Sequence, residues 1–268
     1  MISAKEISFG YRKREQLFYN LSMDIESGIV GLLGKNGAGK STMLKFFAGL
    51  LVPDSGEIVA NNYIPFKRNP NYLSDIYMVP EEFVLPAISI NCYIKAFMPL
   101  YPKFDRSKLE SILTEFELNR NSNLNKLSHG QRKKFLIAFA LASNCGLLIL
   151  DEPTNGLDIP SKSLFRKILV SSVSEEQLVL ISTHQVKDIE TIINEVIVVN
   201  DGAIAFQSQI NEIADKYSFE TVSSLNAFDS VIYHEKSPMG YRVIIPSLDN
   251  DSDVDLELLF NAIINKSI

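Results

Sequence analysis

The chain has 268 residues, of which 46% are hydrophobic, and its formal net charge at pH 7 is −6. This length and apolar content exclude a disordered chain and predict a substantial core, built by one large domain or by one domain with an appendage. The negative charge provides no overall attraction to nucleic acid. No segment approaches 18 consecutive apolar residues, and the first residues contain no charged leader followed by an apolar core, so we expect a cytoplasmic chain that does not itself cross a bilayer.

The two cysteines, Cys92 and Cys145, lie in apolar stretches without a partner cysteine or histidine at metal-ligand spacing. This context predicts that both are buried free thiols, as suits a reducing compartment. No zinc site is expected.

The first 60 residues predict the opening of a mixed sheet. Apolar patterns indicate strands at residues 2–9, 21–25, 29–33 and 56–60. The strand at 29–33 is apolar throughout, which is typical of a strand that is buried on both faces.

Residues from about 86 onward follow a helical period instead. Apolar residues spaced three and four apart predict helices at 89–99, 105–118 and 128–142. Each of these segments begins with serine or aspartate, the residue types that cap helix N-termini. We interpret residues 86–145 as an inserted helical subdomain.

The sheet pattern then resumes. Strands are expected at residues 147–151, 178–182 and 196–199, separated by helices at 160–173 and 186–193. Strands that alternate with helices favour a three-layer α/β core.

The composition changes after residues 201 and 202. The stretch from 209 to 268 is expected to form one helix, short strands such as 241–245, and a closing amphipathic helix at 256–265. We therefore divide the chain into a main domain at 1–208 and a small α+β accessory module at 209–268, in which we find no chemical motif.

Residues 34–42, with the sequence GKNGAGKST, connect an apolar strand to a short helix. This order is typical of a P-loop, whose backbone N–H groups surround phosphate oxygens. Lys40 would supply a cation to the terminal phosphates, and Ser41 a hydroxyl to Mg²⁺. The residues expected to bind the nucleotide at this loop are Asn36, Gly37, Ala38, Gly39, Lys40, Ser41 and Thr42.

The apolar strand at 147–151 ends in two carboxylates, Asp151 and Glu152, followed by Pro153. Alone, this sequence would be an ordinary turn at a strand end. Downstream of a P-loop it has the form of a Walker B strand, in which Asp151 holds the metal and Glu152 is the general base.

Residues 127–133 begin a helix between these two motifs. The simplest interpretation is an N-capped helix. Arg132 and Lys133 nevertheless lie where the helix dipole disfavours cations, which hints at an anionic partner.

Together, the three motifs resemble the nucleotide-binding subunit of ATP-binding-cassette (ABC) transporters, and the resemblance covers roughly residues 1–205. Residues 34–42 match the Walker A motif of that family and 150–153 match its Walker B motif. Residues 127–131 match its Leu-Ser-Gly-Gly-Gln signature. The signature residues expected to cover a nucleotide bound by another subunit are Ser128, His129, Gly130 and Gln131.

Three further positions follow from the same resemblance. Asp158 lies where the family places its D-loop aspartate, and His184 where it places its switch histidine. Tyr11 occupies the position of the aromatic ring that stacks on adenine.

Two positions depart from the family pattern. Glu81 stands where the family usually has glutamine, so it would add a negative charge near Mg²⁺. His129 replaces the first glycine of the signature, although Ser128 and Gly130 are kept, so we expect altered geometry rather than loss of activity.

The resemblance implies a P-loop NTPase fold with an antiparallel N-terminal subdomain, and ATP and Mg²⁺ as ligands. Lys40, Glu152 and His184 would be the catalytic residues of ATP hydrolysis, and Ser41, Asp151 and Glu81 would lie at the metal. Because one chain carries both the P-loop and the signature, two copies are expected to close head to tail over two ATP molecules.

The resemblance also implies a membrane role. The chain would energise a separate permease, which docks near residues 81–97 on the inner face of the cell membrane, and the architecture favours an exporter. Two alternatives remain open at this point: a soluble cassette ATPase that acts on ribosomes or DNA, and a regulatory module with little turnover.

Overall fold

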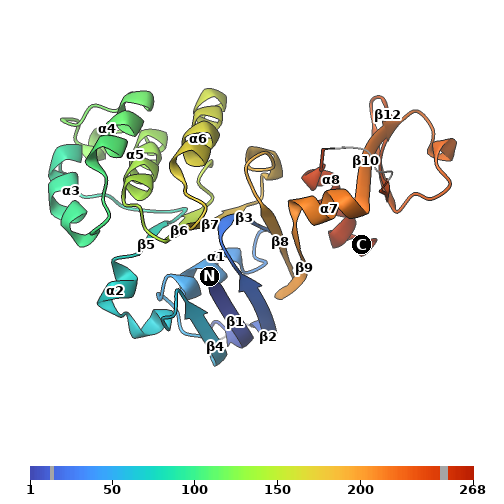
Figure 1. Ribbon diagram of the computed structural model, residues 1–268, viewed down its shortest axis with the longest axis horizontal. Helices are drawn as coiled ribbons and strands as arrows, with labels where there is room; N and C mark the ends of the chain where they lie inside the picture. The colour runs from blue at the N-terminus through green and yellow to red at the C-terminus, as the bar shows by residue number, and fades with distance from the viewer. Residues whose placement is uncertain (13–14, 248–252) are drawn as a thin grey trace.

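The computed structural model describes residues 1–12, 15–247 and 253–268, and these contain three sheets (Figure 1). The six-stranded sheet has the order β5-β6-β7-β3-β8-β9, with β9 antiparallel to β8 and the other neighbouring pairs parallel. Its strands are β3 (Gly28–Leu33), β5 (Ile76–Val79), β6 (Leu147–Asp151), β7 (Leu178–Thr183), β8 (Glu195–Asn200) and β9 (Ala203–Gln209). The continuously apolar sequences of β3, β6 and β7 suit strands that are covered on both faces.

A second, antiparallel sheet has the order β2-β1-β4. Its strands are β1 (Ile2–Gly10), β2 (Gln16–Ile25) and β4 (Ser55–Ala60). Helix α1 (Lys40–Phe47) packs between this sheet and the six-stranded one, since Phe46 and Phe47 share an apolar cluster with residues of both.

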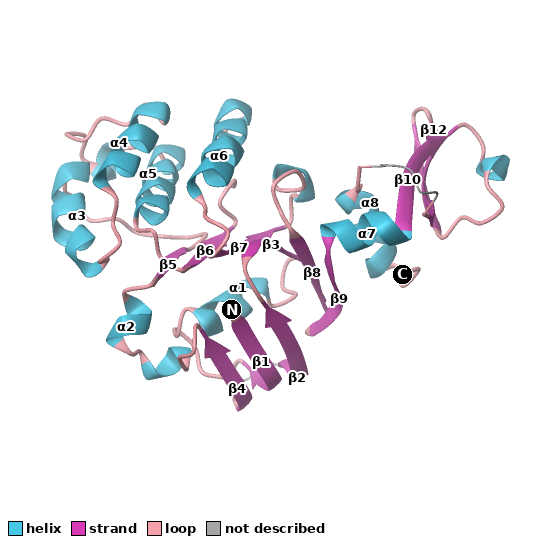
Figure 2. Ribbon diagram, in the orientation of Figure 1, coloured by secondary structure: helices cyan, strands magenta, loops and turns pink. Residues whose placement is uncertain are grey.

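Four helices gather on the opposite side of the six-stranded sheet (Figure 2). They are α3 (Ile90–Phe97), α4 (Arg106–Glu115), α5 (His129–Ala142) and α6 (Ile159–Ser172). Their buried side chains form one cluster with the sheet, in which Phe135, Phe139 and Phe165 are fully buried. A short helix, α2 (Pro70–Leu73), precedes β5.

The C-terminal residues form a third, antiparallel sheet with the order β10-β12-β11 beyond the edge strand β9. The elements are α7 (Ile210–Lys216), β10 (Tyr217–Val222), β11 (Tyr233–Ser237), β12 (Gly240–Pro246) and α8 (Leu256–Ile264). Among the described residues, none of the helices has the length and apolarity that crossing a membrane requires.

The structure confirms the α/β core with an N-terminal antiparallel sheet and helices inserted before β6. Two strands were not predicted: β5 has only four residues, and β9 is an edge strand with one exposed face. The division at residue 208 falls at the end of β9 and remains a prediction.

The helix expected at residues 186–193 is wrong. The chain forms only a 3₁₀ turn, η4 (Val186–Asp188), followed by irregular turns. Ile189 and Ile193 are still buried and pack over Gly31. Two apolar residues four positions apart can therefore both face the core although the segment between them is not helical.

The expectation of two buried thiols is wrong for Cys92. Cys145 is buried, but Cys92 is exposed on α3 because the helix turns the other face, with Ile90, Tyr93 and Ile94, toward the core.

Phe139 connects the inserted helices to the sheet. Its ring lies 5.5 Å from that of Tyr77 on β5, 5.4 Å from that of Tyr93 on α3 and 4.9 Å from that of Phe104, measured between centroids. Phe139→Ala should lower the free energy of unfolding by about 3–5 kcal/mol, because it leaves a cavity where three elements meet. Urea denaturation measures this loss. Phe97→Ala is the control, since Phe97 is 37% exposed, and an equal loss in both variants would contradict the account.

Candidate functional site

The P-loop follows β3 and leads directly into α1. Gly37 and Gly39 adopt left-handed backbone conformations, with φ of 84° and 108°. A Cβ on Gly39 would lie 2.5 Å from the ring of Phe18, whereas no atom lies within 4 Å of a Cβ on Gly37. Glycine is therefore required by packing at position 39 and by backbone conformation at both positions.

Lys40 is the first residue of α1 and is only 7% exposed. Its Nζ donates to the carbonyl oxygens of Gly34, at 2.6 Å, and Lys35, at 3.2 Å. Burial lowers the pKa of Lys40, and the nearby charges of Glu152, Asp151 and Glu81 act in the opposite direction. No side chain caps α1, so its first N–H groups can bind an anion.

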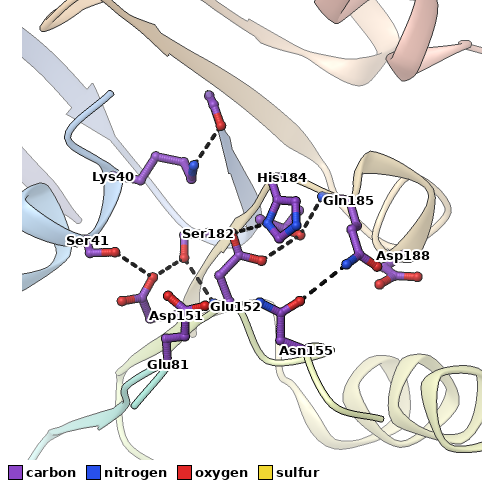
Figure 3. Close-up of polar contacts among 12 residues, drawn as sticks. Lys40, Ser41, Glu81, Asp151, Glu152, Asn155, Ser182, His184, Gln185 and Asp188 are labelled. Carbon is purple, nitrogen blue, oxygen red and sulfur yellow. Dashed lines mark hydrogen bonds and ion pairs between the residues drawn. The ribbon is translucent and has the colours of Figure 1, made fainter. Parts of the chain in front are cut away.

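Asp151 lies at the carboxyl end of β6, next to the end of β7, and β3 follows on the other side of β7 in the parallel sheet. One of its oxygens, Oδ1, accepts hydrogen bonds from Ser41 Oγ at 3.1 Å and from Ser182 Oγ at 2.5 Å. Figure 3 shows these three side chains converging from α1, β6 and β7. The sheet topology thus brings Ser41 into contact with Asp151, the residue predicted to hold the metal.

Glu152 follows immediately and is 5% exposed. Its Oε1 lies 2.8 Å from Nδ1 of His184, and its Oε2 accepts from Thr183 Oγ1 at 3.2 Å (Figure 3). The His184 side chain is 39% exposed, so it connects the buried carboxylate to the surface of the site. Both oxygens of Glu152 are thereby held in a defined orientation.

A network of side-chain hydrogen bonds extends from Glu81. Its Oε1 accepts from Asn155 Nδ2 at 3.1 Å, and Gln185 Nε2 donates to Asn155 Oδ1 at 3.3 Å (Figure 3). At the other end of this network, Lys162 donates hydrogen bonds of 2.7 Å to Gln185 Oε1 and to Asp188 Oδ2. Glu81 is therefore held by Asn155, which lies three positions before Asp158, and through it by Gln185, which follows His184.

Some of these groups border a cavity of about 470 Å³. The residues that line it are Tyr11, Glu15, Leu17, Asn36, Gly37, Gly39, Lys40, Ser41, Thr42, Glu81, Glu152 and His184. The Tyr11 hydroxyl lies 3.0 Å from Thr42 Oγ1, which connects β1 to the P-loop helix. Of the seven loop residues predicted to bind the nucleotide, all but Ala38 are part of the lining.

The predicted signature lies outside this cavity. Ser128 caps α5 by accepting from the backbone N–H of Gln131 at 3.2 Å, and the Gln131 side chain accepts from the Ser128 N–H at 3.0 Å. The ring of His129 stacks on Phe83, with centroids 5.2 Å apart. A Cβ on Gly130 would lie 2.8 Å from the Gly156 carbonyl oxygen, so the glycine is required there. Asp158 caps α6 by accepting from the Ser161 N–H at 3.0 Å.

Sequence reasoning missed several residues around the site. Glu15 and Leu17 line the cavity from β2 and the turn before it, without a motif that marks them. Lys133 was expected to face an anion at the start of α5, but it is fully buried and its Nζ donates to the Glu152 carbonyl oxygen at 2.7 Å. No sequence signal marked this role, because the residues beside Lys133 are also polar and the apolar part of the helix begins only at Phe135.

Comparison with known proteins identifies the family. The family model described as ABC transporter matches residues 18–155. The chain is 27% identical over 245 residues to the ABC transporter ATP-binding protein YtrB of Bacillus subtilis, covering 88% of this chain and 84% of the relative. It is 30% identical over 211 residues to the SkfA peptide export ATP-binding protein SkfE of the same organism, covering 76% of this chain and 87% of the relative.

Solved structures show the same fold. The ATP-binding subunit of an ABC transporter superimposes with a TM-score of 0.72 at 24% identity, covering 80% of this chain and 91% of that one. A dimeric ATP-binding cassette bound to ADP and Pi superimposes with a TM-score of 0.67 at 24% identity, covering 78% of this chain and 98% of that one. The chain belongs to the ABC transporter family as an ATP-binding protein, and it is an ATPase of that family.

Proposed function

We propose that this chain binds ATP with Mg²⁺ in the P-loop cavity and hydrolyses it to drive export through a separate membrane permease. The observation that carries the proposal is the convergence of Lys40, Ser41, Asp151, Glu152 and His184 at one edge of the parallel sheet. This arrangement supplies a cation, a metal-binding oxygen pair and an oriented base around one cavity.

The residues at the cavity suit a triphosphate. The uncapped start of α1 offers N–H groups to phosphate oxygens, and Lys40 can exchange two loop carbonyl oxygens for a phosphate. Tyr11 is 36% exposed at the cavity, which leaves its ring accessible to an adenine base.

The oxygen atoms of Ser41 and Asp151 suit Mg²⁺, which prefers hard oxygen ligands. Glu81 supplies a further carboxylate beside them. When bound, the ion neutralises charge on the transferring phosphoryl group.

Glu152 is placed to activate water. Its Oε2 is held by Thr183, and its Oε1 contacts His184, so the carboxylate cannot rotate freely while it accepts a proton from the attacking water. His184 orients the carboxylate and lies at the exposed side of the cavity. Lys40 and the loop amides stabilise the charge that develops on the phosphoryl oxygens.

We further propose that two copies complete each site. Ser128, His129, Gly130 and Gln131 are absent from the lining of the chain's own cavity, and they surround the N-terminus of a 14-residue helix. This helix end can bind phosphate of a nucleotide held by a second copy, while Asp158 would lie at the contact between the copies. The chain alone provides two half-sites.

The permease is proposed to dock on residues 81–97 and on the adjacent groove. Val84 is 95% exposed in this segment, and the groove, of about 710 Å³, separates the α2 region from η2 (Met98–Leu100). Leu50 and Leu100, each 57% exposed, are among its lining residues. Exposed apolar side chains beside a groove are typical of a protein-binding surface, and docking there would hold the chain at the inner face of the membrane.

Export is the proposed direction. It is supported by relatives that are named for export, SkfE and the cytochrome c biogenesis protein CcmA of Reclinomonas americana. A relative named for molybdate import also exists in Haemophilus influenzae, so transport assays must decide the direction. The net charge of −6 gives no support to the alternative of a ribosome- or DNA-bound ATPase.

Lys40→Ala should weaken ATP binding roughly 10- to 100-fold, because a buried charged donor to the phosphates is lost. Isothermal titration calorimetry measures the dissociation constant. Lys45→Ala, on the same helix, is the control and should bind normally. Normal ATP affinity and turnover in Lys40→Ala would contradict the assigned role.

Glu152→Gln should keep ATP affinity but lower turnover about 10²- to 10⁴-fold, because the amide cannot accept the proton from water. The ATP-bound dimer should therefore accumulate, as measured by light scattering after size-exclusion chromatography. Glu176→Gln removes an exposed carboxylate away from the cavity and should behave as wild type. Equal turnover in Glu152→Gln and wild type would refute the base assignment.

Glu81→Gln should tighten ATP binding in the absence of Mg²⁺ about three- to tenfold, since one negative charge leaves the cavity while an oxygen remains to accept from Asn155. Titration in EDTA measures this, with Glu82→Gln as the control. Weaker or unchanged binding would show that the carboxylate does not repel the nucleotide.

Purification of tagged Glu152→Gln protein from native membranes with ATP and Mg²⁺ should recover a polytopic membrane protein, identified by mass spectrometry. Val84→Asp and Leu100→Asp should lose it, because a charge disfavours an apolar contact. Met239→Asp, on the exposed β11–β12 turn, should retain it. Recovery of ribosomal proteins or DNA without a membrane protein would support the soluble alternative.

A further inference from the structure

Lys133 is a fully buried lysine inside α5. Lysine is almost never fully buried unless it is paired, and here Nζ donates a 2.7 Å hydrogen bond to the backbone carbonyl oxygen of Glu152. It lies five residues beyond the cap Ser128, about 8 Å further along the helix axis. The ammonium group therefore connects α5 to the backbone of the proposed catalytic base.

The backbone of Glu152 needs such support. Its φ of 47° lies in the left-handed region, which is unfavourable for a residue with a side chain. Its N–H donates to the Ser182 carbonyl oxygen at 3.0 Å, and its own carbonyl oxygen accepts from Lys133. The residue is thus held on one side by β7 and on the other side by α5, which suits a strained conformation maintained at a functional site.

The charged groups that act on Lys133 are the carboxylates of the proposed catalytic site. Burial lowers the pKa of Lys133, and the charges of Glu81, Glu152 and Asp151 act in the opposite direction. The charges of the same three carboxylates also act to raise the pKa of Lys40, which approaches them from the P-loop side. Lys133 is therefore a second ammonium group beside this cluster, and unlike Lys40 it is not part of the cavity lining.

We infer that Lys133 is a positioning residue for ATP hydrolysis: it holds the left-handed Glu152 peptide, and so fixes the direction in which the Glu152 carboxylate meets water. This inference rests on the proposed role of Glu152 as general base. Lys133 itself does not touch the nucleotide. Because α5 begins at the signature, the same bond connects the helix end that faces a second copy's ATP to the base of the chain's own site.

The test compares Lys133→Met, Lys133→Arg, Glu152→Gln and a matched control, Lys108→Met, all in the full-length protein with ATP and Mg²⁺. Lys108 on α4 is also partly buried and donates to a backbone carbonyl oxygen, but its acceptor is Ser172, at 3.0 Å, and not a residue of the proposed catalytic site. Steady-state hydrolysis gives kcat and KM, calorimetry gives the ATP dissociation constant, and thermal melts give Tm.

Lys133→Met should lower kcat roughly 10- to 100-fold, as expected for a displaced catalytic group, while the ATP dissociation constant changes less than about twofold. Lys133→Arg keeps a cationic donor and should recover at least part of this loss. Lys108→Met should lose stability but keep kcat.

A kcat within about twofold of wild type in Lys133→Met would overturn the inference. Loss of ATP binding together with turnover in both Lys133 variants would assign the residue to stability alone and would also overturn it. Glu152→Gln separates this failure from that of the proposed function: full turnover in that variant removes the base assignment, whereas lost turnover there with normal Lys133 variants removes only the positioning role.

Discussion

The site depends on the balance of buried charge at the carboxyl edge of the six-stranded sheet. Glu81, Asp151 and Glu152 bring three carboxylates to this edge, and Lys40 and Lys133 bring two ammonium groups from opposite sides. Each lysine also donates to backbone carbonyl oxygens, Lys40 within its own loop and Lys133 to Glu152. Asp151, Glu152, Lys40 and Lys133 are buried, whereas Glu81 is exposed. A charge that is buried without a partner is strongly unfavourable, so the four buried groups constrain one another's positions.

The parallel topology makes this balance possible. The ends of β3, β6 and β7 lie side by side, so the loops that follow them deliver Lys40, Asp151, Glu152 and His184 to one place although they are up to 144 positions apart in the chain. C-terminal residues also pack near this edge. Lys187, three positions after His184, forms a 3.0 Å ion pair with Glu257 on α8, and Ile189 shares an apolar cluster with Leu256 and Leu259.

Much of this arrangement could be predicted from the sequence because its signals are local. The P-loop glycines, the carboxylates after an apolar strand and the caps of α3, α4 and α5 are encoded within a few residues each, and the family pattern indicates their order. The structure then brings Lys40, Ser41, Asp151, Glu152, Glu81 and His184 together as expected.

The remainder depends on tertiary packing. The short strand β5 is defined by its pairing with β6 and not by its own pattern, and the apolar spacing of Ile189 and Ile193 is satisfied by turns that pack on Gly31. The contact between Lys133 and Glu152 could not be predicted, because the two residues are 19 positions apart in the sequence. The acceptor is also a backbone oxygen, which every residue type provides. The exposure of Cys92 likewise depends on which face of α3 meets the core.

The central claim is that hydrolysis requires the P-loop of one copy and the signature of another. Mixing two inactive variants, Lys40→Ala and Ser128→Arg, tests it most directly, because a heterodimer would contain one site in which both halves are intact. The account predicts that ATPase activity, absent from each variant alone, appears when the two are mixed with ATP and Mg²⁺. Absence of activity in a mixture that demonstrably forms heterodimers, or full activity of Ser128→Arg by itself, would contradict it.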